Sequence, residues 1–77
     1  MSDVEQRVKK VVAQVLKIDP ARIKSESRFV EDLGAESIQS IELIAAFEEE
    51  FDIEMDDEQA NEVKTVGSAV KFIQKLV

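Results

Sequence analysis

The sequence predicts an all-α fold, a small four-helix bundle with three longer helices, one short helix and a long first loop. Three segments place apolar residues at the i, i+3, i+4 and i+7 spacing of amphipathic helices, and no segment alternates like a half-buried strand. The chain has 77 residues, enough for one hydrophobic core, so we expect a single domain over residues 1–77. It has no cysteine, so packing alone must stabilise this domain.

The first helix is expected over residues 3–17. Its apolar face is formed by Val4, Val8, Val11, Val12, Val15 and Leu16. Ser2 and Glu5 have the spacing of a capping box, which favours a helix start here. Asp19-Pro20 favours an end soon after Lys17, because proline disfavours helical geometry in the residue before it.

Residues 19–36 are expected to form a long ordered loop. They show no sustained period and contain Pro20 and Gly34. Most connections in compact domains are far shorter, so such a loop needs anchors. We expect Ile23, Phe29 and Leu33 to hold it against the core.

The second helix is expected over residues 37–51. Leu43, Phe47 and Phe51 recur every four residues and should face the core, with Ser40 and Ile44 at the flanks. The opposite face then carries Ile38, Ile41, Glu42, Ala45, Glu48 and Glu49. This face is apolar near Ser37 and acidic further along, as expected of an interaction surface.

A short helix is expected at about 57–62 and a last helix near 66–76. Asp56 and Gln59 are spaced to cap the short helix, which depends on packing because of its length. Thr65 should cap the last helix. One side of that helix is formed by Val66, Ala69, Val70, Ile73 and Leu76.

The charge is distributed unevenly along the chain. The net charge is −7, and residues 29–63 hold thirteen Asp or Glu and no Lys or Arg. A field of this sign repels nucleic acid and anionic lipid and attracts partners with basic patches. We therefore expect no nucleic-acid or membrane partner. An acidic surface that only keeps a small protein in solution is the alternative reading.

The composition argues against catalysis by the chain itself. It has neither histidine nor cysteine, which removes Ser-His-Asp and Cys-His sites and the usual zinc ligands. A calcium loop starting at Asp52 would need glycine at its sixth position and glutamate at its twelfth, where Asp57 and Val63 stand. We expect no enzyme activity and no metal site. Nothing resembles a signal peptide or a membrane span, so a cytoplasmic location is expected.

Ser37 follows Gly34 at the expected start of the second helix, and its hydroxyl has two possible roles. Serine is a favoured N-cap, and most serines at helix starts do no more than cap. A capping box, however, would need Glu or Gln at position 40, where Ser40 stands. The positive end of a helix also favours a phosphate ester on this hydroxyl.

The segment from Phe29 to Ser37 resembles the attachment loop of acyl carrier proteins. The resemblance continues through Ile41-Glu42-Leu43, residues 47–52, residues 55–66 and Phe72-Ile73, so it covers essentially the whole chain. It implies one acyl-carrier domain with 4'-phosphopantetheine attached to the Ser37 hydroxyl. Acyl groups would be held as thioesters on this arm and delivered between enzymes of fatty acid or related acyl-chain biosynthesis.

The resemblance also implies partners and a contact surface. The partners would be a phosphopantetheinyl transferase and acyl-chain synthases and acyltransferases with basic docking patches, bound by a monomeric carrier. The contact residues would be Glu36, Ile38, Ile41, Glu42, Ala45, Glu48 and Glu49. We also expect a fatty chain to bind between the second helix and the short helix, lined by Phe47, Ala60 and Val63, because burial stabilises each methylene by about 0.8 kcal/mol.

The sequence departs from the family pattern at the attachment site. Family members usually have Asp-Ser-Leu where this chain has Glu36-Ser37-Ile38, and often methionine where it has Ala45. These changes alter the surface that a transferase contacts. A carrier for polyketide, aminoacyl or other specialised groups, or an unmodified acidic interaction module, remains as an alternative.

Overall fold

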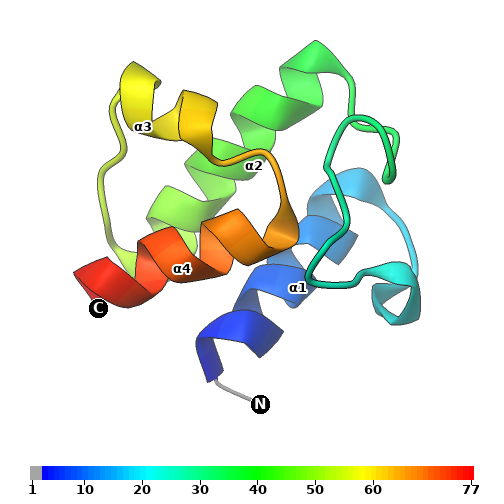
Figure 1. The fold of residues 1–77 in the computed structure, drawn as a ribbon, viewed down its shortest axis with the longest axis horizontal. Helices are drawn as coiled ribbons and strands as arrows, with labels where there is room; N and C mark the ends of the chain where they lie inside the picture. The colour runs from blue at the N-terminus through cyan, green and yellow to red at the C-terminus, as the bar shows by residue number, and fades with distance from the viewer. Residues whose placement is uncertain (1–2) are drawn as a thin grey trace.

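The computed structural model describes residues 3–77, and this part of the chain folds into four α-helices and one 3-10 turn (Figure 1). The elements are α1 (Asp3–Leu16), η1 (Pro20–Arg22), α2 (Ser37–Phe51), α3 (Asp57–Glu62) and α4 (Val66–Leu76). The predicted all-α class is confirmed, and so are the bounds of α2, α3 and α4. Among these residues no helix is long and apolar enough to cross a bilayer.

The core lies where α1 packs against α2 and α4. Its helical members are Val8, Val11, Val12, Ala13, Leu16, Leu43, Phe47, Phe51, Val66, Ala69 and Ile73. All of them except Ala13 were predicted to face the core from the apolar spacing. Leu76 was predicted to face the core as well, but its side chain is 48% exposed in the last turn of α4.

The first helix ends at Leu16, one residue earlier than expected. Lys17 has a φ of 57°, the left-handed conformation that commonly ends a helix. The expected capping box with Glu5 involves Ser2, which lies outside the described residues. Two contacts between α1 and α2 were not expected from the sequence. Arg7 Nη2 donates to the Glu50 carbonyl at 2.7 Å, and Arg7 Nε forms an ion pair with Glu50 Oε2 at 2.9 Å. Arg7 thus binds a carbonyl in the last turn of α2, which has no partner within the helix.

The long loop after α1 is held at several points. It begins with η1, where Asp19 Oδ1 accepts from the Ala21 N–H at 2.9 Å. Ile23 and Phe29 are buried and Leu33 is partly buried, so the three expected anchors are confirmed.

The backbone of this loop is also bonded to the start of α4. The N–H of Phe29 donates to the Lys64 carbonyl at 3.0 Å. In the other direction, the Val66 N–H donates to the Ser27 carbonyl at 3.0 Å and the Gly67 N–H donates to the Ser25 carbonyl at 2.8 Å. The loop is therefore attached to the helical part of the fold by its backbone as well as by its buried side chains.

The short helix α3 is capped as the sequence predicts but is weakly packed. The Gln59 N–H donates to Asp56 Oδ1 at 2.7 Å, and the Asp56 N–H donates to Gln59 Oε1 at 3.1 Å. None of its six residues is buried. In Figure 1 it lies at the edge of the bundle, away from the long loop.

Candidate functional site

Ser37 is the first residue of α2, and its side chain is exposed. The N-cap is Glu36, and its backbone N–H donates to Gln39 Oε1 at 2.9 Å, as in a capping box. Ser37 is therefore not the N-cap. The capping box is formed one residue earlier than considered above, by Glu36 and Gln39. No residue from 3 to 77 hydrogen-bonds the Ser37 hydroxyl, which leaves it free to react.

The backbone before Ser37 turns sharply at Gly34. Gly34 has a φ of 74°, a conformation that glycine adopts without the steric cost other residues bear. A Cβ here would meet no atom within 4 Å, so the requirement comes from the backbone angle and not from crowding. Ala35 then returns to the core, where it is buried and donates its N–H to the Phe29 carbonyl at 2.8 Å.

Arg28 and Asp32 fix the shape of the loop before Gly34. Arg28 Nε and Nη2 contact the two oxygens of the Asp32 carboxylate at 3.0 Å each, and the Arg28 N–H donates to Asp32 Oδ2 at 2.9 Å. The side-chain hydrogen bond, followed by the backbone one, lowers the pKa of Asp32, and the same pair raises the pKa of Arg28. Sequence reasoning missed this pair, although a loop acid four residues after an arginine was a visible signal.

The surroundings of Ser37 fit a phosphodiester. The first N–H groups of a helix have no intrahelical partner and carry the positive end of its dipole. An exposed hydroxyl at this point offers room for a bulky group and a favourable position for a negative charge. The fit depends on this position at the helix start, because α2 has no Lys or Arg that could pair with the phosphate.

Large apolar side chains are exposed on the first turns of α2 and in the preceding loop. Ile38 is 66% exposed and Ile41 is 70% exposed, as the helical pattern predicts. Val30, in the preceding loop, is 54% exposed and was not predicted. Of the acidic and small candidates, Glu36, Glu42, Ala45 and Glu49 are exposed, whereas Glu48 is half-buried.

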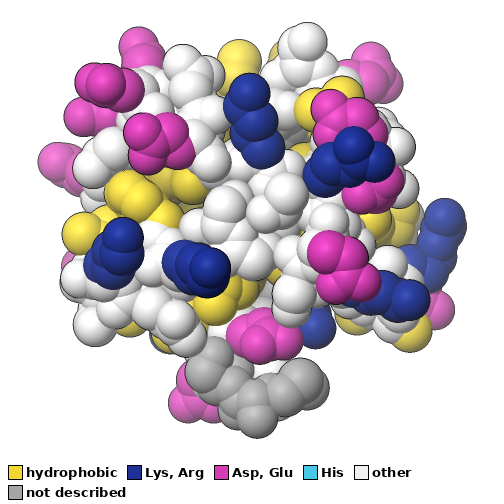
Figure 2. Space-filling view, viewed as in Figure 1, with side chains coloured by type: hydrophobic (Ala, Val, Ile, Leu, Met, Phe, Trp, Pro, Cys, Tyr) yellow, Lys and Arg dark blue, Asp and Glu magenta, His cyan; other side chains and the backbone are white. Residues whose placement is uncertain are grey.

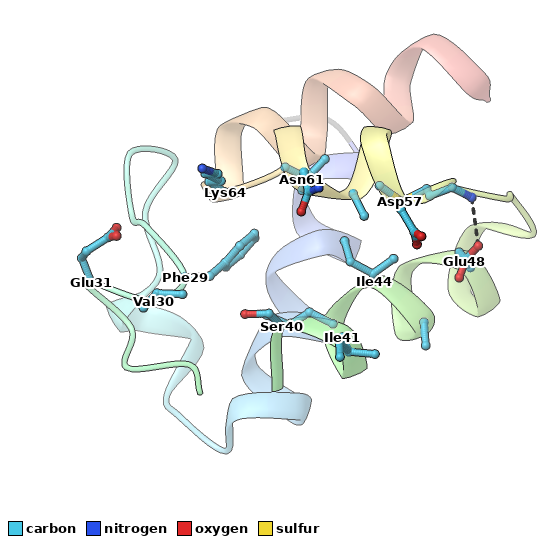
Figure 3. A pocket seen from close by; sticks show the side chains of 15 residues that line it. Phe29, Val30, Glu31, Ser40, Ile41, Ile44, Glu48, Asp57, Asn61 and Lys64 are labelled. Carbon is cyan, nitrogen blue, oxygen red and sulfur yellow. Dashed lines mark hydrogen bonds between the residues drawn. The ribbon is translucent and has the colours of Figure 1, made fainter. Parts of the chain in front are cut away.

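A pocket of about 520 Å³ lies between α2, α3 and the loop around Phe29 (Figure 3). Ala60 and Val63 line it, as expected. Phe47 does not line it, because its side chain is completely buried in the core. Phe29 supplies the aromatic wall instead, with its ring centroid 6.3 Å from that of Phe47.

The wall that α2 gives to this pocket begins one turn after Ser37. Ser40 and Ile41 follow Ser37 at i+3 and i+4, and Ile44 and Glu48 continue the same face. The helix rises about 1.5 Å per residue, so this wall is roughly 12 Å long from Ser40 to Glu48. A group attached to Ser37 can therefore reach the pocket along a continuous helix face.

The surface near α3 and the surface over α4 carry charges of opposite sign, whereas elsewhere some acids and bases are paired, as at Arg28 and Asp32. In Figure 2, Asp and Glu side chains gather where Figure 1 places α3, and Lys side chains lie over α4. Within residues 3–77 no group of three or more Asp or Glu side chains is arranged to hold a metal ion.

Comparisons with known proteins agree with this geometry. Residues 6–73 match the family model described as phosphopantetheine attachment site. The acyl carrier protein of Phenylobacterium zucineum (strain HLK1) is 52% identical over 75 residues, which cover 97% of this chain and 95% of that protein. The acyl carrier protein of Caulobacter vibrioides (strain NA1000 / CB15N) is 51% identical over 73 residues, with 95% and 94% covered.

Proposed function

The chain belongs to the acyl carrier protein family, and on this basis we propose that Ser37 carries its 4'-phosphopantetheine arm. The observation that supports this site is the exposed hydroxyl at the first residue of α2, with the pocket beginning one turn later. Residues 1–77 act as one acyl-carrier domain in this proposal.

The chain is an acyl carrier that bears a covalent 4'-phosphopantetheine, and fatty acid or related acyl-chain biosynthesis is the usual role of such carriers. The arm supplies the thiol that holds acyl groups as thioesters, and this chain has no cysteine of its own. Members of the family carry groups and do not catalyse reactions. We extend this to the present chain, which also lacks histidine, the commonest general base.

Carriers of this family interact with synthases and transferases. In our proposal these are a phosphopantetheinyl transferase and acyl-chain synthases and acyltransferases with basic patches. Their apolar contacts are Ile38, Ile41 and Ala45, and their ionic contacts are Glu36, Glu42, Glu48 and Glu49. Acidic residues on one face accelerate encounters with a basic partner and make them salt-sensitive. The monomeric state and the cytoplasmic location stay predictions.

The pocket between α2 and α3 is the proposed site for the acyl chain. Leu43, Ile44 and Val63 give it apolar walls, and burial of each methylene contributes roughly 0.8 kcal/mol. Backbone chemical shifts on acylation should change in α3 as well as around Ser37. Changes confined to the surroundings of Ser37 would contradict chain binding in this pocket.

Intact mass tests the attachment. After incubation with coenzyme A and a broad-specificity phosphopantetheinyl transferase, the wild-type chain should gain one phosphopantetheine and Ser37→Ala should gain none. Ser40→Ala is the matched control, because Ser40 lies one turn later on the same face and should not alter the gain. An unmodified wild-type chain, with the transferase verified on another carrier, would favour the acidic interaction module instead.

A further inference from the structure

Two adjacent glutamates on α2 have different surroundings. Glu49 is exposed, and its side chain forms no hydrogen bond or ion pair with any residue from 3 to 77. Glu48 is half-buried and lines the pocket, and its Oε2 accepts a hydrogen bond from the Met55 N–H at 2.9 Å (Figure 3). The two residues were predicted from the sequence to have the same role in docking. In the structure, only the Glu49 carboxylate has no hydrogen bond within the protein.

Glu48 fastens the segment between α2 and α3 more than once. Its backbone carbonyl accepts from the N–H of Asp52 and, at 3.1 Å, from that of Ile53. The side chain adds the bond to Met55, the residue directly before the N-cap of α3. Met55 also lines the pocket, so this bond joins two of its walls.

This bond matters because α3 has few other attachments. Ala60 is its one apolar residue, and no residue of the helix is buried. A helix of six residues is not stable without packing or capping. A hydrogen bond to an ionised acceptor is roughly twice as strong as a neutral one, so we expect the loss of this bond to loosen α3.

We propose that the Glu48 carboxylate is a positioning residue for cargo binding: through the Met55 N–H it holds α3 closed over the pocket. Both glutamates can still contact basic partners, but only the Glu49 carboxylate has no internal hydrogen bond to keep. This proposal rests on the proposed function, because it takes the pocket to be the binding site of the acyl chain. The hydrogen bond itself can be tested in the unmodified chain.

Amide hydrogen exchange of the unmodified chain tests the bond to α3. In Glu48→Ala, the amides of Ala60 and Val63 should exchange about tenfold faster than in wild type, because a bond to a charged acceptor is lost. Glu48→Gln keeps an acceptor oxygen and should restore most of the protection. Glu49→Ala is the matched control and should leave both rates unchanged, as should the core amide of Val12 in every variant.

Reactivity of the loaded protein tests the effect on cargo. With a medium-chain acyl group on the phosphopantetheine arm, the thioester of Glu48→Ala should react several-fold faster with hydroxylamine, and those of Glu48→Gln and Glu49→Ala should react as wild type does. Equal exchange rates in Glu48→Ala and Glu49→Ala would overturn the assignment while leaving the carrier function intact. Failure to load the arm would refute the carrier function, and the exchange result would still decide the role of Glu48.

Discussion

The long loop at residues 19–36 and the segment at residues 52–64 bound the same pocket, but the fold holds them differently. The loop has almost no regular structure, yet Ile23, Phe29 and Ala35 are buried and its backbone is bonded to the start of α4. The second segment contains a well-formed and capped helix, α3, of which no residue is buried, and Val63 is the one residue of this segment in the core. Regular backbone structure is therefore a poor guide to how firmly a segment is held. Burial and long-range bonds decide it.

The largest expected difference between the two regions comes from apolar truncation. Phe29→Ala should lower the free energy of unfolding by about 3–5 kcal/mol, because a buried aromatic side chain is lost from the core. Ala60→Gly in α3 should cost no more than about 1 kcal/mol, the propensity difference of an exposed helix. Urea unfolding of wild type and both variants measures these two losses in the free energy of unfolding. Equal losses would show that α3 is held as tightly as the loop.

A smaller effect is expected where the loop touches α4. A Cβ at Gly67 would lie 3.0 Å from the Ser25 carbonyl oxygen, which already accepts the Gly67 N–H at 2.8 Å. Gly67→Ala should therefore destabilise the protein by about 1–3 kcal/mol, although alanine is the better helix former. Lys71→Ala, at an exposed position of the same helix, should stay within about 0.5 kcal/mol of wild type. If Gly67→Ala were more stable than wild type, the loop backbone at Ser25 could move away from the added Cβ at little cost.

The smallest effect is expected from the exposed pair in the loop. Arg28 lowers the pKa of Asp32 in the folded state, so the pair stabilises the fold above the unfolded pKa of about 3.9. This contribution is lost as the pH falls through the folded pKa. The melting temperature of Asp32→Asn should thus be below that of wild type at pH 7, and the gap should narrow near pH 3. A gap of the same size at both pH values would contradict a role for the Asp32 charge.

The helix bounds could be predicted because their signals are local. Thr65 and the Asp56–Gln59 pair cap α4 and α3 within three residues of sequence, and the apolar period marks the core face. The start of α2 was also predicted, but its N-cap was not. Serine is the commoner cap, whereas the turn at Gly34 places Glu36 in that position.

The parts of the site that could not be predicted depend on contacts between distant segments. The hydrogen bond from Met55 to Glu48 spans seven residues and follows from the path of the backbone after α2. The exchange of Phe47 for Phe29 in the pocket wall has the same origin. Helical spacing places Phe47 on the inner face but cannot say that the loop will cover it with Phe29.

The most direct measurement is a tandem mass spectrum of the chain after transfer from coenzyme A. The added phosphopantetheine should be found on the peptide containing Ser37 and on that serine alone. Localisation to any of the other serines, or its persistence in Ser37→Ala, would contradict the assignment of the attachment site.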